Sequence, residues 1–185
     1  MTKTYTTDRL ILRTLEDYEG DLSLAYYKAN KDFLAPYEPT RDDSFYTLEH
    51  HTKLVTIEQS EMNQRNMFRL WVFLKDGSVE RPIGNIGFTN IVRGVFLSCF
   101  LGYKLDKDYC QQGYMKEALN RAIDLMFKDY GLHRIEANIM PSNTPSLALC
   151  RSLNFTEEGL AHKYLRINNK WEDHIHMVIF NEALE

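Results

Sequence analysis

The stretch that decides the fold is VFLSCFLGYKLDKDYCQQGYMKEALNRAIDLM, which occupies residues 95–126. Its opening part, Val95 to Leu105, is dominated by apolar and aromatic residues and predicts a strand. From Tyr114 to Tyr130 the apolar residues recur at helical spacing and predict a helix with one buried face. The chain therefore passes from a strand, through a loop that ends at Gly113, into a long helix.

The loop before this helix has the features of an anion-binding site. The first N–H groups of a helix lack intrahelical partners, and the positive end of the helix dipole favours a phosphate there. Gly113 would let a ligand approach the backbone closely. One glycine is also compatible with a plain tight turn, so both interpretations stay open at this point.

The N-terminus of a second helix follows the next predicted strand, and we call such a helix start after a strand a helix mouth. Residues 141–146 read PSNTPS, in which Thr144-Pro145 predicts an N-cap followed by proline at the first helical position, with the helix continuing to Leu153. Asn143 and Ser146 lie at this mouth, where helix capping is the alternative to ligand binding. Two such mouths after neighbouring strands indicate a nucleotide diphosphate held along a sheet.

The remaining segments complete a mixed pattern. We predict strands at 9–13, 68–74, 83–91, 133–140, 162–167 and 171–180, and helices at 14–29 and 47–65. Residues 30–44 form a polar loop with prolines and aromatic residues, which favours a contact surface. The order β-α-α-β-β-β-α-β-α-β-β indicates an α/β or α+β domain, and we expect a single domain over residues 1–185.

Composition excludes several classes of protein. With 44% hydrophobic and 26% charged residues, the chain is neither disordered nor fibrous. A net charge of −4 lacks the basic excess of a nucleic-acid binder, so we expect no direct nucleic-acid partner. Three cysteines without a CxxC or Cys/His spacing predict free thiols and no metal site. No apolar run reaches the length of a signal peptide core or a membrane span, so we expect a cytoplasmic protein.

Five segments, taken in order, resemble the GNAT acetyltransferase superfamily and, within it, the RimJ/RimL-like branch of ribosomal-protein N-terminal acetyltransferases. The similarity covers essentially the whole chain. The segments are the opening strand at Thr7–Arg13, the loop Asn30–Pro39 of alanine-type enzymes, the coenzyme A pyrophosphate motif in Leu101–Ala118, the helix and its end at Asn143–Gly159, and the last strand around Trp171, Asp173 and His174.

The resemblance implies a GNAT-type fold with acetyl-CoA as co-substrate. Its central sheet is mixed and mostly antiparallel, with flanking helices, and its fourth and fifth strands form a parallel pair that splays apart around acetyl-CoA. No metal is implied. The coenzyme-binding residues implied are Gly102, Tyr103, Lys104 and Leu105 for pantetheine, Gln111, Gln112, Gly113, Tyr114 and Met115 for the pyrophosphate, and Asn143 and Ser146 at the second helix mouth.

The implied reaction sets the demands on the catalytic residues. The site must align an amine with the thioester, deprotonate an ammonium, hold an oxyanion and protonate the leaving thiolate. An α-amino group, with a pKa of about 8 against about 10.4 for lysine, demands a weaker base. Ser146 is the best candidate for the proton donor to the thiolate, because Cys150 stands where many family members carry a tyrosine.

No general base is assigned by the motif. Phe100 occupies the position at which many relatives carry a carboxylate. Glu136, Tyr164 and His162 are the candidates that remain. A His174–His176 metal pair and a reactive Cys110 are weaker alternatives.

We therefore expect an N-acetyltransferase that acts on the N-terminal alanine, or serine, of a ribosomal or other protein. The segment 30–43 and the final hairpin would form the acceptor cleft, with Tyr37 and Trp171 as apolar walls that bind the substrate. One alternative is a small-molecule amine as acceptor, and another is an acyl-CoA-binding module without catalysis. The sequence leaves open whether the chain is a monomer or a homodimer.

Overall fold

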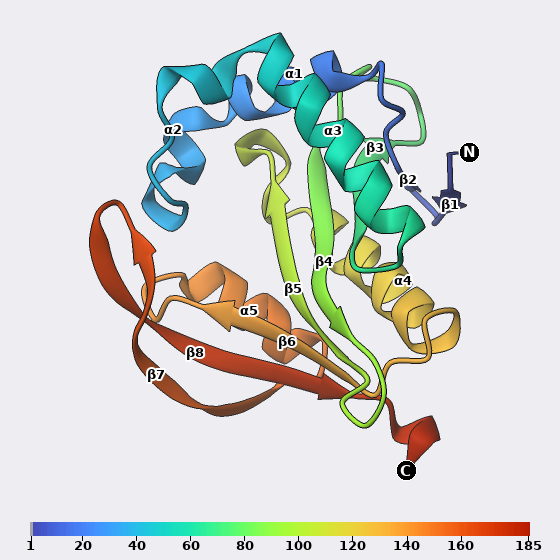
Figure 1. The fold of residues 1–185 in the computed structure, drawn as a ribbon, viewed down its shortest axis with the longest axis vertical. Coiled ribbons are helices and arrows are strands. Elements are labelled where there is room, and N and C mark those ends of the chain that lie inside the picture. The colour runs from blue at the N-terminus through green and yellow to red at the C-terminus, as the bar shows by residue number, and fades with distance from the viewer. Residues whose placement is uncertain (1) are drawn as a thin grey trace.

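The computed structural model describes residues 2–185, and within that range the strands form one eight-stranded sheet of order β1-β2-β3-β4-β5-β6-β8-β7 (Figure 1). The strands are β1 Thr4–Thr6, β2 Leu10–Arg13, β3 Phe68–Leu74, β4 Gly84–Val92, β5 Ser98–Leu105, β6 Arg134–Ile139, β7 Thr156–Ile167 and β8 Lys170–Phe180. Neighbouring strands run antiparallel except for β5 and β6. The expected GNAT-type mixed sheet is thus confirmed.

Helices cover both faces of this sheet. They are α1 Gly20–Ala29, α2 Lys31–Leu34, α3 Leu48–Asn63, α4 Tyr114–Lys128 and α5 Thr144–Ser152. Alternate residues of β3 serve the two layers, because successive strand side chains point to opposite faces. Leu70 and Val72 join the core under α4 and α5, whereas Trp71 and Phe73 pack with the core of α1 and α3.

The parallel pair is short, and this positions the site. β5 pairs with β6 only from Ser98 to Phe100, opposite Arg134 to Glu136. Beyond Phe100, β5 continues beside β4 as far as Leu105, while β6 continues beside β8 as far as Ile139. The two strands therefore diverge, as Figure 1 shows. They correspond to the fourth and fifth predicted strands, whose expected splaying is confirmed.

Several element boundaries differ from the sequence prediction. β1 was not predicted, because three residues are too few to show a period. α1 begins at Gly20 instead of residue 14, since Glu19 turns back to pair with Arg13 at 2.7 Å. β7 begins six residues before the predicted position 162 and is mostly exposed, so no apolar alternation marks its first half.

Two local predictions are corrected. The segment 30–44 is not a plain loop, because α2 and a 3₁₀ turn at Ala35–Tyr37 lie within it and a second 3₁₀ turn begins at Asp43. The N-cap of α5 is Asn143 instead of Thr144, since the Asn143 side chain accepts a hydrogen bond from the Ser146 N–H at 3.3 Å. Among residues 2–185, no helix is long and apolar enough to cross a membrane.

Candidate functional site

The gap between β5 and β6 presents an open strand edge. One edge of β5 is paired with β4 from Gly84 to Val92, whereas the opposite edge has no strand partner within the described chain after Phe100. The backbone groups of residues 101–105 on that edge are free to bond an extended ligand, since a strand edge presents unpaired N–H and C=O groups. The predicted residues Gly102 to Leu105 lie along it.

The loop after β5 leads this edge to the start of α4. Gln111 and Gly113 both adopt left-handed backbone conformations, with φ of 60° and 81°. Among the described residues 2–185, no side chain caps the α4 N-terminus, in contrast to α5, whose cap is Asn143. The first N–H groups of α4, at Tyr114 and Met115, are therefore available for an anion, and the helix dipole favours one.

A brace from the turn between β1 and β2 holds this loop. The Glu117 carboxylate accepts hydrogen bonds from the Thr7 hydroxyl at 2.6 Å and from the Arg9 backbone at 2.8 Å, and pairs with the Arg9 guanidinium at 2.7 Å. Arg9 also donates to the Gln112 carbonyl at 3.0 Å and packs over the Tyr114 ring. The brace fixes where the loop and the helix N-terminus lie.

On the α5 side of the gap, three side chains form a hydrogen-bonded cluster. The Tyr103 hydroxyl lies 2.6 Å from Ser146 Oγ and 3.3 Å from Cys150 Sγ. Burial raises the pKa of Tyr103 well above its usual value, so the phenol stays protonated. The Tyr103 side chain thus points at Ser146, and its hydroxyl can donate to or accept from the serine.

On the opposite face, a second cluster surrounds Glu136. Its Oε1 lies 2.6 Å from His176 Nδ1 and its Oε2 lies 2.6 Å from Arg134. Burial alone would raise the pKa of Glu136, but the hydrogen bonds from Arg134 and His176 outweigh it and hold the pKa below its usual value. The Tyr164 ring packs on His176 with centroids 5.0 Å apart, and its hydroxyl accepts from Asn138 Nδ2 at 3.3 Å.

The structure thus brings two of the three base candidates together and separates the third. Glu136 and Tyr164 both contact His176, whereas His162 is largely exposed and pairs with Asp173 at 2.9 Å. His176 is not among the predicted bases, although its position in the last strand places it on one face with His174. The distance from His176 to Glu136 depends on the register of β6 with β8, which cannot be read from the sequence.

The weaker alternatives find no support. His174 Nδ1 lies 3.1 Å from the Glu172 carbonyl oxygen, and among residues 2–185 no group of three or more His, Cys, Asp or Glu side chains is placed to hold a metal. Burial and the nearby Asp106 and Asp108 raise the pKa of Cys110, which opposes a reactive thiolate.

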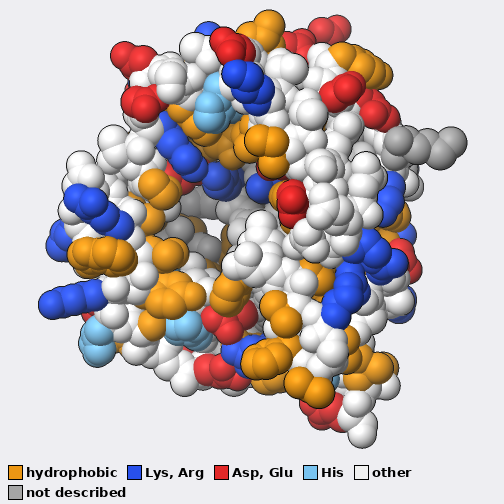
Figure 2. All heavy atoms as spheres, in the orientation of Figure 1, with side chains coloured by type: hydrophobic (Ala, Val, Ile, Leu, Met, Phe, Trp, Pro, Cys, Tyr) orange, Lys and Arg blue, Asp and Glu red, His pale blue; other side chains and the backbone are white. Residues whose placement is uncertain are grey.

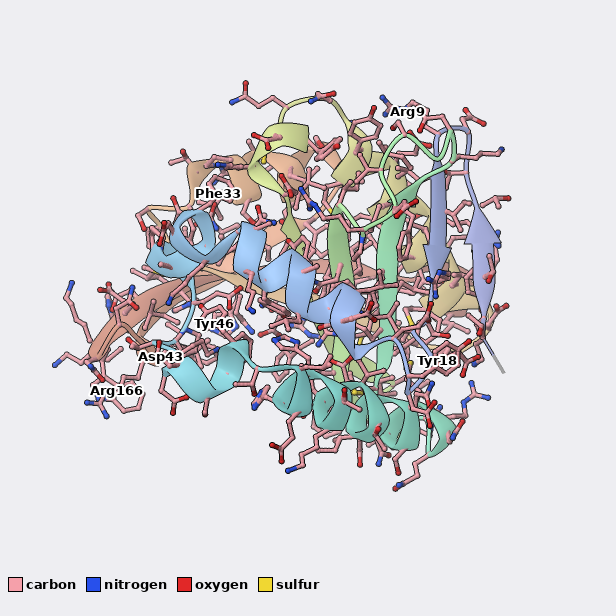
Figure 3. The ribbon with its side chains drawn as sticks, turned by 90° about the horizontal axis from the view of Figure 1, so that it is seen from above. Arg9, Tyr18, Phe33, Asp43, Tyr46 and Arg166 are labelled. Atoms are coloured by element: carbon pink, nitrogen blue, oxygen red, sulfur yellow. The ribbon has the colours of Figure 1, made fainter. Side chains whose placement is uncertain are left out.

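The segment after α1 and the β7–β8 hairpin meet across the same face. Asn168 at the hairpin turn donates to the Ala35 carbonyl at 2.7 Å and accepts from the Thr40 hydroxyl at 3.2 Å. Tyr37 and Trp171 are 39% and 58% exposed, so both predicted wall residues have apolar surface to offer. Figure 2 shows the hollow beside the hairpin, and Figure 3 shows Asp43 and Arg166 at the same end of the molecule.

Lys104 links that segment to β5. Its Nζ lies 2.6 Å from Glu38 Oε1 and donates to the Tyr27 hydroxyl at 3.3 Å. The Lys104 side chain therefore points to the face of the sheet that carries Tyr27 and Glu38, and only its backbone is placed to serve a ligand in the gap between the strands.

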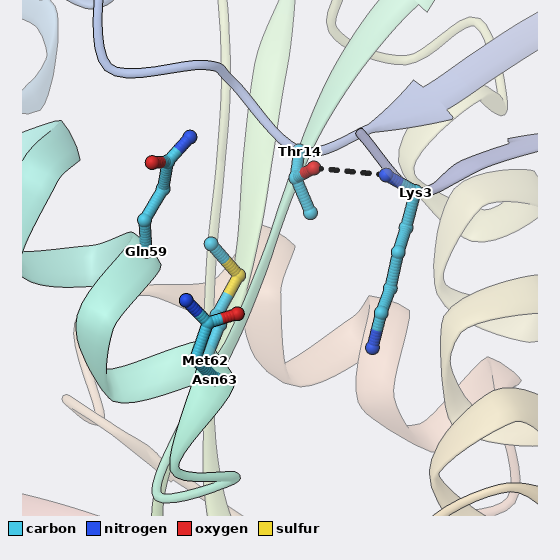
Figure 4. A pocket seen from close by; sticks show the side chains of 5 residues that line it. All are labelled: Lys3, Thr14, Gln59, Met62 and Asn63. Carbon is cyan, nitrogen blue, oxygen red and sulfur yellow. Dashed lines mark hydrogen bonds between the residues drawn. The ribbon is translucent and has the colours of Figure 1, made fainter. Parts of the chain in front are cut away.

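Two depressions lie outside the gap. A groove of about 700 Å³ runs between the end of α3, the segment just before β3 and the end of β4, and it reaches Phe100. A smaller pocket of about 70 Å³ is lined by Lys3, Thr14, Gln59, Met62 and Asn63 (Figure 4). The smaller pocket contains none of the predicted site residues.

Comparisons with known proteins agree with this geometry. A family described as "Acetyltransferase (GNAT) domain" matches residues 9–156. The [Ribosomal protein uS5]-alanine N-acetyltransferase of Escherichia coli is 39% identical over 171 residues, which cover 92% of this chain and 87% of that protein.

Solved structures give the same result. The ribosomal-protein-S5-alanine acetyltransferase of Vibrio fischeri superposes with a TM-score of 0.93 at 32% identity and covers 99% of both chains. RimJ of Mycobacterium smegmatis, solved in complex with CoA-disulfide, superposes with a TM-score of 0.90 at 26% identity, covering 100% of this chain and 89% of that chain.

Proposed function

The chain belongs to the GNAT acetyltransferase family, whose co-substrate is acetyl-CoA, and we propose that it acetylates the free N-terminal amine of a protein, preferably one that begins with alanine. The relative from E. coli and the neighbour from V. fischeri are both named as alanine acetyltransferases of a ribosomal protein. A ribosomal protein is accordingly the client that we propose for this chain.

The open edge of β5 is the single observation that carries the proposal. It leads from the end of the β5–β6 pairing at Phe100 to the uncapped N-terminus of α4. Pantetheine would form hydrogen bonds with the backbone of Gly102, Tyr103, Lys104 and Leu105. The pyrophosphate would accept hydrogen bonds from the N–H groups of Gln111, Gln112, Gly113, Tyr114 and Met115. In this proposal acetyl-CoA supplies the activated acetyl group.

Asn143 has a smaller role in this proposal than Ser146. Its side chain already accepts the Ser146 N–H, which leaves it one further lone pair and an amide donor for the coenzyme. Ser146 is both held by this cap and bonded to Tyr103. A fixed hydroxyl beside the gap suits a proton donor to the leaving thiolate.

The two faces of the gap supply different chemistry in this proposal. Ser146 lies on the α5 face, whereas Glu136 and Tyr164 lie in the cluster on the opposite face. An amine that enters past Tyr37 and Trp171 would meet the Glu136 cluster first. The proton taken from the amine and the proton given to the sulfur would then be handled by different side chains, one acting as general base and the other as general acid.

The proposal is tested by thiol release from acetyl-CoA with three peptides of otherwise identical sequence. One has a free alanine N-terminus, one a free serine N-terminus, and one a blocked N-terminus with an internal lysine. We expect release with alanine to exceed release with serine, and none with the blocked peptide. Release only with small amines, such as a polyamine, would contradict the proposed acceptor.

A further inference from the structure

We propose that His176 is the catalytic residue that accepts the proton of the acceptor amine, and that Glu136 is the positioning residue that holds its ring. This inference deepens the proposed function and rests on it. It is carried by the hydrogen bond between these side chains and by their place at the mouth of the gap between β5 and β6.

The bond to Glu136 determines which ring nitrogen of His176 is free. The carboxylate is ionised, because Arg134 and His176 hold its pKa low against the effect of burial. An ionised carboxylate only accepts hydrogen bonds, so the Nδ1 of His176, 2.6 Å from Glu136 Oε1, carries the proton. In the neutral ring, Nε2 is then left with its lone pair and can accept a proton.

Strand register places His176 at the point where the gap opens. It pairs with Asn138 across β6 and β8, and Asn138 is the second residue after the last one that pairs with β5. Register partners share a face, as do alternate residues of a strand, so His176 lies on the face of Glu136 and Phe100. Ser146 approaches from the other face, through Tyr103.

One polar atom beside His176 lacks a partner. Asn138 Oδ1 is buried and accepts no hydrogen bond from any residue of the described range 2–185, while Asn138 Nδ2 donates to the Tyr164 hydroxyl. A buried, unpaired oxygen is costly unless a ligand group satisfies it. It offers an acceptor for a second hydrogen of the bound amine, next to the ring that takes the first.

The groups around the ring favour a fixed orientation. Tyr164 packs on His176 from β7, and Arg134 ties Glu136 to Glu158 through bonds of 2.7 Å to both Glu158 oxygens. The charged and titratable groups that surround His176 are thus Arg134, Glu136, Glu158 and Tyr164. His174 packs on the far side of Tyr164. The His176 side chain retains 24% exposure, which leaves an approach for the amine.

The proposed step moves the acetyl group from sulfur to nitrogen. His176 Nε2 takes one proton from the ammonium, and the lone pair of the resulting amine forms the C–N bond as the carbonyl π pair moves to oxygen. When that pair returns, the C–S bond breaks with its electrons on sulfur, and Ser146 Oγ protonates the sulfur. The second amine proton leaves to water, which also reprotonates Ser146 and takes the proton back from His176.

The first test replaces the ring. We expect His176→Ala to lower kcat at least about 100-fold, the scale of general base loss, with the KM for acetyl-CoA changed less than about three-fold. Added imidazole should restore activity, and more basic methylimidazoles should restore more. His176→Asn, which keeps a donor for Glu136 but no base, should lose kcat equally. His133→Ala is the matched control, because His133 also pairs with a glutamate, Glu185, away from the gap.

The second test needs no turnover. In ¹⁵N spectra of the wild-type ring at pH 8, the proton should be on Nδ1 and Nε2 should be bare. Glu136→Gln should yield a mixture of both tautomers, because an amide can donate as well as accept. It should also lower kcat less than His176→Ala does.

The outcomes distinguish a failure of the proposed role of His176 from a failure of the proposed protein acceptor. Full kcat in His176→Ala, or a loss that imidazole does not restore, would overturn the role of His176 while leaving the acceptor in place. If the wild type acetylates only small amines, the acceptor is wrong and the same variants are assayed with that amine. A proton on Nε2 in the wild type would overturn the dyad by itself.

Discussion

At the scale of single residues, the α5 side of the gap is built from a serine and a tyrosine that are far apart in sequence. Ser146 was predicted from its position in the helix mouth, but its bond of 2.6 Å to Tyr103 was not. A strand residue and a helix residue meet there because β5 carries Tyr103 on the face that α5 covers. Side-chain alternation gives the face of Tyr103, but only the packing of α5 gives the partner.

Removal of the Ser146 hydroxyl tests the acid role. We expect Ser146→Ala to lower kcat ten-fold or more, because a positioned general acid contributes on that scale or above, while the Kd of acetyl-CoA changes little. Steady-state kinetics and equilibrium binding measure the two effects. Thr156→Ala, on the exposed start of β7, is a control that should change neither. An unchanged kcat in Ser146→Ala would reduce Ser146 to a part of the helix start.

At the scale of elements, α4 is the helix whose start is left free. Its N-terminus has no side-chain cap, and Gly113 before it adopts φ of 81°. From the sequence, Gly113 before this helix was compatible with an anion site and with a plain tight turn, and the missing cap favours the anion site. The brace by Thr7 and Arg9 could not be predicted, because it joins residues more than a hundred positions apart.

Gly113→Ala tests whether the free helix start binds the coenzyme. A methyl group there would lie 3.4 Å from the Arg9 guanidinium, and the alanine would have to keep the positive φ of 81°, which is unfavourable for any residue with a Cβ atom. We expect the Kd of acetyl-CoA to rise about ten-fold and stability to fall by about 1 kcal/mol. Gly131→Ala is the matched control, with φ of 65° and open space around it. It should lose similar stability and bind acetyl-CoA normally, and an equal loss of binding in both variants would contradict the role of Gly113.

The packing of α1 against α3 predicts a pH dependence of folding. His51 on α3 is fully buried beside Ser23 of α1, and burial together with His50 lowers its pKa from 6.5 to about 4. Between these values the unfolded chain binds a proton that the native protein excludes, so stability falls as pH is lowered from 6.5 to 4. The slope should be about 1 kcal/mol per pH unit.

Denaturant unfolding across this pH range measures the effect as the difference between wild type and His51→Gln. The glutamine variant should show a shallower loss of stability between pH 6.5 and 4 than the wild type. Identical slopes for wild type and His51→Gln would show that His51 does not titrate differently in the folded state.

At the scale of the whole molecule, the proposed function depends on the sheet being interrupted between β5 and β6, which pair only as far as Phe100. The gap after Phe100 separates a face that carries Glu136 and His176 from a face that carries the Ser146 hydroxyl, and we propose that acetyl-CoA binds between them. Local pattern predicted the strand, the loop and the helix of residues 95–126, whereas the splayed parallel pair and the acid role of Ser146 were expected from the family resemblance. The sequence left the proton acceptor open, because the contact between Glu136 and His176 depends on the register of β6 with β8.

The central claim is tested most directly with one peptide that has both a free N-terminal alanine and an internal lysine. The peptide is incubated with acetyl-CoA and the purified protein, and the acetylated position is mapped by mass spectrometry. We predict acetyl on the alanine nitrogen alone, and none with the protein omitted. Acetyl on the lysine, or no transfer by a protein that binds acetyl-CoA, would contradict the account.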